Sequence, residues 1–291
     1  MNYYRFIAVE KAHHSVVLLC RVLGVAKSAF YAWQHHHVSA HAQADERLTD
    51  QIRAIHDESR CTYGAPRVHA ELRKRGTRVA RKRVARLMRA AKLIGRCPRR
   101  FRKTTIPDPT AQIPDLVERQ FRPALPDAVW VADITYVRTW EGWLYLAVIL
   151  DAFSRRVVGW ALADHLRTEL ASAALRMALG SRRPRPGVIH HSDRGAQYTS
   201  AAYGDVLAAH GARQSVGNPG TCWDNAVAEA FFATLKKELL YRHAWPTHQA
   251  ARAAIVEFIE GFYNRVRLHS TLDYRSPLIC EEDYYRLTTA A

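Results

Sequence analysis

The sequence predicts an α/β fold, with a mixed five-stranded sheet and helices, preceded by a small all-α region. Three strand-like runs follow one another at hairpin spacing between residues 130 and 163. Helical and strand-like segments then alternate as far as residue 240, which is typical of parallel strands covered by helices. Before residue 104 the apolar residues follow only helical spacing.

Composition narrows the class of protein. A chain of 291 residues allows two or three domains, and its net charge of +16 indicates a polyanionic partner. Five scattered cysteines argue against a disulfide framework and for a reducing cytoplasm. No apolar run is long enough for a membrane helix, and no signal-peptide pattern is present. We therefore expect a cytoplasmic protein with no membrane partner.

Residues 1–44 predict two short helices, Ser15–Leu23 and Ala26–Trp33, on either side of Gly24. Two interpretations stay open: a helix-turn-helix that offers Lys27, Ser28 and Tyr31 to DNA, or a hairpin held only by its apolar residues. The histidines at 35–37 and 41 lack an accompanying Cys-x-x-Cys pair, so we expect a polar linker rather than a zinc site.

Residues 45–103 predict a basic helix-turn-helix DNA-binding domain. Leu48, Ile52 and Ile55 mark a first amphipathic helix, while Pro66 suits the start of a second helix that Gly76 ends. A third helix carries many cations, and a run of one sign would repel itself without a partner. The cations expected to contact DNA are Arg78, Arg81, Lys82, Arg83, Arg86 and Arg89.

Residues 104–127 are rich in proline and predict a linker. An α/β core is expected at 128–240, followed by a C-terminal helical extension at 241–291. Within the core we expect strands at 130–138, 143–151, 156–163, 187–192 and 212–216, and helices at 168–179, 200–210 and 225–240.

Three carboxylates stand out in the core. Asp193 follows the buried strand 187–192, at the end of a strand where active sites of open α/β sheets form. Asp133 interrupts a β-branched and aromatic run, where an unpaired acid is costly. Glu229 lies outside the apolar side of the helix 225–240. Lys236 lies two turns further along the same face of the helix, at a distance that suits a phosphate group next to the acids.

Gathered carboxylates repel one another unless cations neutralise them. Oxygen ligands suit Mg²⁺ or Mn²⁺, and two such ions activate a water or a 3′-hydroxyl in phosphodiester chemistry. His190 and His191 are candidates to orient a metal-bound carboxylate. Asp151 also ends an apolar strand, but the hairpin-like turn after it favours a structural role.

The C-terminal extension contains Tyr263-Asn264-Arg265 followed by Arg267 and His269. Arg265 and Arg267 are candidate contacts to the DNA backbone. Alternatively, Arg265 packs the C-terminal helix.

Together these motifs resemble the DDE transposases of the retroviral-integrase superfamily, and most closely the second-frame protein (OrfB) of the IS-three group of insertion sequences. The resemblance rests on the strand around Asp133, on His-Ser-Asp-Arg-Gly-Ala-Gln-Tyr around Asp193, on the helix of Glu229 and on the C-terminal motif. Thirty-five residues separate Asp193 from Glu229, the spacing that names the acidic motif of this group. Ala196 stands where serine is more usual.

The resemblance implies a ribonuclease H-like core with Asp133, Asp193 and Glu229 as catalytic and metal-binding residues, using two Mg²⁺ or Mn²⁺ ions. It implies cleavage at element ends, then strand transfer to DNA through a circular intermediate. The implied partners are double-stranded DNA, further copies of the chain, and an upstream-frame protein joined by frameshifting. The alternatives are a catalytically inactive DNA-binding regulator of transposition and a retroviral-type integrase or ribonuclease; the basic helical module and the missing zinc motif disfavour the latter.

Overall fold

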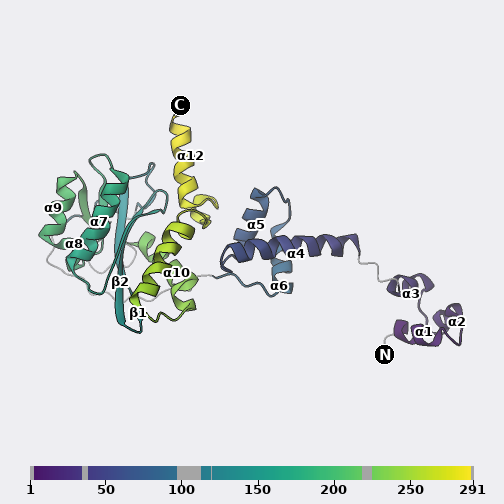
Figure 1. The fold of residues 1–291 in the computed structure, drawn as a ribbon. Helices are drawn as coiled ribbons and strands as arrows, with labels where there is room; N and C mark the ends of the chain where they lie inside the picture. Colours follow the sequence, from purple (N-terminus) through teal and green to yellow (C-terminus); the bar gives the residue numbers. More distant parts are fainter. Residues whose placement is uncertain (1–2, 35–38, 97–112, 119, 218–224, 290–291) are drawn as a thin grey trace.

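The computed structural model describes residues 3–34, 39–96, 113–118, 120–217 and 225–289. Figure 1 shows three bodies in a row: an α/β core, a helical module next to it, and a small helical unit at the N-terminal end. In the described part of the chain no single helix has the length and apolar character to span a membrane. One pair, Val16–Val22 with Lys27–Gln34, meets those criteria together but is bent by 117°.

The core is built on one five-stranded sheet in the order β3-β2-β1-β4-β5. Strands β1 (Val129–Thr139), β2 (Gly142–Asp151) and β3 (Val157–Ala163) are antiparallel neighbours, while β4 (Ile189–Ser192) and β5 (Arg213–Val216) run parallel to β1. This is the predicted ribonuclease H-like sheet. Its strands form from runs of β-branched and aromatic residues joined by short turns.

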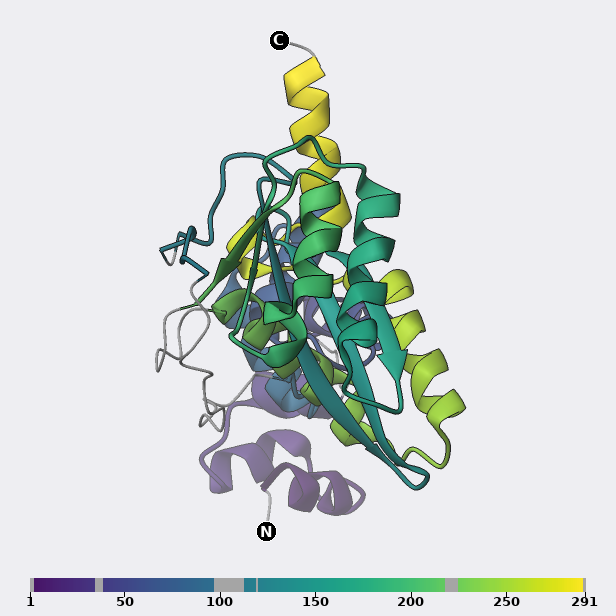
Figure 2. The ribbon, with the colours of Figure 1, turned by 90° about the vertical axis from the view of Figure 1, so that its left-hand side faces the viewer.

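Helices cover both faces of the sheet (Figure 1). The even-numbered residues of β1, such as Trp130 and Ala132, pack beneath α7 (Thr168–Arg182), and Figure 2 looks onto this face. Short α8 (Ala196–Thr199) and α9 (Ala201–Ala209) adjoin α7, so the single helix expected at 200–210 is preceded by an extra turn. A Cβ on Gly159 would lie 2.3 Å from the Ala174 carbonyl oxygen, so only glycine lets α7 lie this close to β3.

The odd-numbered residues of β1, such as Val131 and Val137, pack on the opposite face beneath α10 (Ala226–Glu238). Phe231, Phe232 and Leu235 supply the buried side of this helix, as its apolar spacing predicts. This face of the sheet therefore carries both the odd-numbered side chains of β1 and the helix of Glu229.

The helical module consists of α4 (Ala40–Glu58), α5 (Ala65–Lys74) and α6 (Arg81–Ala90). The oxygen of Ser39 caps α4 and Pro66 lies in the first turn of α5. Gly76, with φ of +83°, ends α5 as predicted. Because α4 begins at Ala40, the boundary predicted between residues 44 and 45 falls inside this helix.

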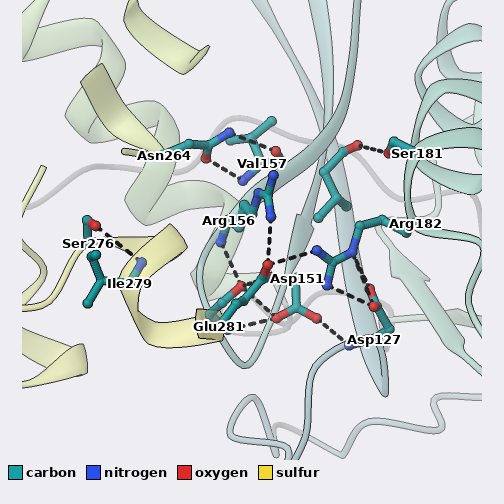
Figure 3. A network of polar contacts seen from close by, with 12 residues as sticks. Asp127, Asp151, Arg156, Val157, Ser181, Arg182, Asn264, Ser276, Ile279 and Glu281 are labelled. Carbon is teal, nitrogen blue, oxygen red and sulfur yellow. Dashed lines mark hydrogen bonds and ion pairs between the residues drawn. The ribbon is translucent and has the colours of Figure 1, made fainter. Parts of the chain in front are cut away.

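The C-terminal extension is helical, as expected. It comprises η1 (Leu240–Arg242), α11 (His248–Val256), the π-helix η2 (Glu257–Tyr263), η3 (Ser270–Leu272) and α12 (Pro277–Thr289). Figure 3 shows how it is attached: Asn264 exchanges two hydrogen bonds of 3.0 Å with the backbone of Val157, and Glu281 pairs with Arg156 and Arg182. These contacts tie α12 to the edge of the sheet at β3.

The N-terminal unit contains α1 (Tyr3–Glu10), α2 (Val16–Val22) and α3 (Lys27–Gln34) around a separate small apolar core. Two of these helices match the sequence prediction, with Gly24 at φ of +66° between them, and α1 is additional. The alternatives for this unit, a helix-turn-helix or a packed hairpin, stay open. The histidines at 35–37 lie outside the described residues.

The described end of the predicted linker lies against the core. Val117 and Phe121 are buried in it, and Val216 donates a backbone hydrogen bond to the Pro114 carbonyl oxygen. A proline-rich composition does not reveal such contacts, because they depend on side chains far away in the sequence.

Candidate active site

The sheet register brings Asp133 and Asp193 together. Strands β1 and β4 are parallel, with Trp130 opposite His190 and Val131 opposite His191. Continuing this register by two residues, past the end of β4, places Asp133 opposite Asp193, with the Asp133 side chain on the α10 face. Both acids are half-buried. Gly195 donates a backbone hydrogen bond of 3.1 Å to the Asp193 carboxylate and so fixes its orientation.

Glu229 reaches the same face from above. It lies in the first turn of α10 and is exposed, whereas Val227 and Ala228 beside it are buried. Helix α10 packs on β1, and the negative charge of Glu229 acts on Asp133, so the two carboxylates are within electrostatic reach of each other. The three acids therefore come from a strand middle, a strand end and a helix start.

The electrostatics of Asp133 reflect this grouping. Burial, followed by the negative charges of Asp193 and Glu229, raises the pKa of Asp133 to about 8, although the Ile134 N–H and Lys236 act in the opposite direction. Burial also raises the pKa of Asp193, against the N–H of Gly195. A cation at this site would favour the ionised form of Asp133, because it would counteract both the burial and the neighbouring negative charges.

Asn225, the residue at the N-cap position of α10, adds an oxygen near the acids. Its side-chain N–H donates to the Ala132 carbonyl oxygen at 2.9 Å, next to Asp133. Its Oδ1 is buried and accepts no hydrogen bond from the described residues, an arrangement that calls for a donor or a cation. No signal in the sequence reveals this contact, because it joins positions 93 residues apart.

The donor set fits a hard divalent cation. Three carboxylates and one amide oxygen are the ligand types that Mg²⁺ and Mn²⁺ prefer. Within the described ranges, however, no three Asp, Glu, His or Cys side chains lie close enough to hold one ion. The acids are within electrostatic reach of one another, but their side chains are not preassembled as a closed cage.

Lys236 lies within electrostatic reach of Asp133. It is half-buried, and its Nζ lies 5.5 Å from the ring centroid of Tyr136 on β1. Burial lowers the pKa of Lys236, while the charge of Asp133 raises it. Tyr136 thus supports the Lys236 ammonium group through a cation–π contact that the sequence does not reveal.

Both histidines lie deeper in the core than the acids. His190 is fully buried, with Nε2 2.9 Å from the Tyr203 hydroxyl, and burial lowers its pKa to about 3. His191 faces the other side, with Nδ1 2.9 Å from the Ser215 hydroxyl. A neutral His190 packs the α7 face, so of the two only His191 shares a sheet face with Asp133.

Asp151 has the structural place predicted for it (Figure 3). It is fully buried, and its carboxylate accepts backbone hydrogen bonds of 2.7 Å from Asp127 and Ser154. Burial raises the pKa of Asp151 to about 6. Because both oxygens are used inside the core, Asp151 is not available to a substrate.

The predicted DNA-binding cations fall into two groups, those that form ion pairs with carboxylates and those that are exposed. Arg83 and Arg86 both form ion pairs with Asp45 of α4. Arg267 is 3% exposed and its guanidinium makes a bidentate pair with Glu238. The remaining predicted cations are exposed: Arg78, Arg81, Lys82, Arg89 and Arg265.

Comparisons with known proteins agree with this architecture. Integrase core domain models match residues 123–222 and 210–277, and an HTH-like domain model matches residues 43–101. The "Insertion element IS600 uncharacterized 31 kDa protein" of Shigella sonnei is 42% identical over 92% of this chain and 99% of its own. The "Transposase InsF for insertion sequence IS3A" of Escherichia coli is 38% identical over 94% and 96%.

Solved structures are more distant. A simian T-cell lymphotropic virus intasome in complex with a PP2A regulatory subunit has a chain 17% identical, covering 79% of this chain and 74% of its own, with a TM-score of 0.47. The HTLV-2 integrase catalytic core domain with magnesium is also 17% identical, covering 55% and 99%, with a TM-score of 0.41.

Proposed function

The chain belongs to the insertion-sequence transposases of the IS3 family, and we propose that Asp133, Asp193 and Glu229 are its catalytic acids. A single observation carries this proposal: β1 and β4 are parallel neighbours up to Val131 and His191, and the same register continued by two residues leads to Asp133 and Asp193, beside the helix of Glu229. Transposases are polynucleotidyl transferases, so the site acts on phosphodiester bonds.

The acids hold divalent metal in this proposal. Asp133, Asp193 and Glu229, with the Oδ1 of Asn225, supply oxygen ligands to two Mg²⁺ or Mn²⁺ ions. When bound, such ions activate the attacking oxygen and stabilise the leaving oxygen. The raised pKa of Asp133 supports this role, because metal would repay the cost of ionising a buried acid among like charges.

The remaining side chains position DNA. Lys236, held over Tyr136, binds the phosphate next to the scissile bond. Gly195 holds Asp193 in place through its backbone N–H. The same acids serve twice: first for hydrolysis, which frees a 3′-hydroxyl at the element end, and then for attack of that hydroxyl on another strand.

The helical module recognises duplex DNA. Its α5–turn–α6 arrangement presents the exposed Arg81 and Lys82 at the start of α6, where recognition helices contact DNA. Arg78, Arg89 and Arg265 contribute further cations, while Arg83, Arg86 and Arg267 contribute less because each has a carboxylate partner. The partners are thus the terminal repeats and target DNA, with two or more copies of the chain on paired ends. An upstream-frame protein completes the assembly.

A catalytically inactive regulator is the competing function. Such a protein has no need for three acids within electrostatic reach of one another, or for a buried Asn225 oxygen that accepts no hydrogen bond from the described residues, and these features favour the enzyme. The deciding experiment uses a labelled element-end duplex with Mg²⁺. We expect wild type to cut it and Asp133→Asn to bind it without cutting; equal cutting by both would exclude Asp133 from the site.

A further inference from the structure

A cavity of about 780 Å³ lies between α10 and the helical module, next to the proposed active site. One wall is α10, where Ala226, Ala230 and Ala233 line the cavity on the side adjacent to Glu229. The facing wall includes Gly64 and Arg67 at the start of α5. Small side chains on α10 keep this space open. Its volume is in the range that holds small molecules.

The cavity has an excess of positive charge. Arg67 and Arg155 line it, and each donates to a backbone carbonyl: Arg67 to Leu268 at 2.9 Å and Arg155 to Phe121 at 3.1 Å. Among the described residues neither forms an ion pair, in contrast to Arg267, which has Glu238. A guanidinium has five N–H donors, so most of those on Arg67 and Arg155 are left for a ligand.

The positive charge also affects the pKa of His269, which lines the cavity. Burial, and then the cations Arg267, Arg67 and Arg155, push the pKa of His269 well below its ordinary value. Several guanidinium groups therefore act on one buried ring. Cations held this close in a partly buried space are stabilised by an anion, and phosphate matches the planar guanidinium fork.

Three aromatic residues line the cavity: Phe121, Tyr263 and Tyr274. Phe121 and Tyr263 are buried, so Tyr274 is the one with an accessible surface. Tyr274 is half-buried. Its own backbone and that of the preceding Asp273 both lie in the left-handed region, with φ of +58° and +52°. Such backbone is costly outside glycine and is typical of functional sites. Bare phosphate needs no aromatic wall, whereas a nucleobase stacks on one.

We propose that this cavity binds an unpaired nucleotide of the DNA strand, with its phosphate on Arg67 and Arg155 and its base against Tyr274. The inference rests on the proposed function only in taking DNA as the substrate. Because one wall is the helix of Glu229, a nucleotide in the cavity would hold the strand next to the acids.

The test measures binding by the full chain rather than catalysis. Two labelled probes are compared: a short oligothymidylate and a strand of equal length without bases. Wild type should bind oligothymidylate about tenfold more tightly, since base stacking adds to phosphate binding. Equal affinity for both probes would overturn the proposal and leave a phosphate site only.

Two variants locate the effect. Ala230→Leu keeps a good helix former but fills the cavity, so the preference for bases should vanish. Arg155→Gln should weaken both probes about tenfold by removing a charged phosphate contact. The matched control is Ala253→Leu, an exposed alanine of α11 outside the cavity, which should bind as wild type does. An unchanged base preference in Ala230→Leu would also overturn the proposal.

The result is separable from the catalytic proposal. Asp133→Asn should retain the base preference while losing strand cleavage. If Asp133→Asn still cleaves, the catalytic assignment fails and the cavity is unaffected; if base preference is absent in wild type while cleavage depends on Asp133, only the cavity proposal fails.

Discussion

Gly195 limits the space around Asp193. A Cβ at this position would lie 3.1 Å from the Asp193 carboxylate and 3.0 Å from the Gln197 side chain, although φ of −63° suits any residue. Gly195→Ala should therefore displace the carboxylate without straining the backbone. We expect the strand-cleavage rate to fall on the order of tenfold with little change in thermal stability.

Gly180 provides the matched control. A Cβ on Gly180 in α7 would meet no atom within 4 Å, so Gly180→Ala should keep wild-type cleavage. It should also raise the free energy of unfolding by about 0.5–1 kcal/mol, because alanine favours a helix. Cleavage at the wild-type rate by Gly195→Ala would show that Asp193 tolerates displacement.

The buried pair of Arg267 and Glu238 supports the fold next to the site. Both side chains are almost fully buried, with N–O distances of 2.8 and 2.7 Å. Glu238→Gln should lower the free energy of unfolding by about 3–5 kcal/mol, because the guanidinium is left without a counter-charge. Equilibrium unfolding in urea measures this free-energy difference. For the exposed pair Arg53–Asp50, Asp50→Asn should change stability by less than about 1 kcal/mol; similar losses in both variants would contradict this account.

Single residues also show what sequence can and cannot predict. Asp133, Asp193 and Glu229 were singled out, and are proposed as the catalytic acids, because costly or phased acids interrupt regular patterns. The role of Asn225 was not, since its partner is a backbone carbonyl far away in the sequence. Arg267 was predicted as a DNA contact because the sequence shows only its charge. Its ion pair with Glu238, 29 residues earlier in the chain, is visible only in the structure.

Among the elements, α6 carries a testable role. Arg81 and Lys82 are exposed in its first turn. Replacing both with alanine should weaken duplex binding. The slope of the logarithm of the binding constant against the logarithm of the salt concentration should fall by about two, because two phosphate contacts are removed. The measurement is affinity for duplex DNA over a range of salt concentrations. As a control, Arg286→Ala on α12 removes a cation already paired with Asp283 and should leave the slope unchanged.

Helices and strands with clear periodicity were predicted correctly, and their exceptions have physical causes. Helix α1 was missed because its apolar residues lie on more than one side, with Tyr3 and Val9 exposed while Ile7 is buried. The described end of the linker packs on the sheet through Val117 and Phe121, which proline content obscures. The π-helix η2 continues the apolar pattern of α11, so local spacing does not distinguish it.

For the whole molecule, activity should depend on divalent metal. Chelation should stop strand cleavage, and Mg²⁺ or Mn²⁺ should restore it. Ca²⁺ should support DNA binding better than turnover, because its larger and more flexible coordination shell does not hold the geometry of the reaction. Full cleavage after exhaustive chelation would contradict the role given to the carboxylates.

Cleavage and joining by Asp193→Asn test the central claim most directly. The substitution keeps volume but removes one negative charge. Uncut and precut labelled element ends measure hydrolysis and strand transfer separately, with Asp151→Asn as the control acid inside the core. We predict that Asp193→Asn loses both reactions and still binds DNA, while Asp151→Asn retains both. Cleavage by Asp193→Asn near the wild-type rate, or equal inactivity of a folded Asp151→Asn, would contradict the assignment of the site.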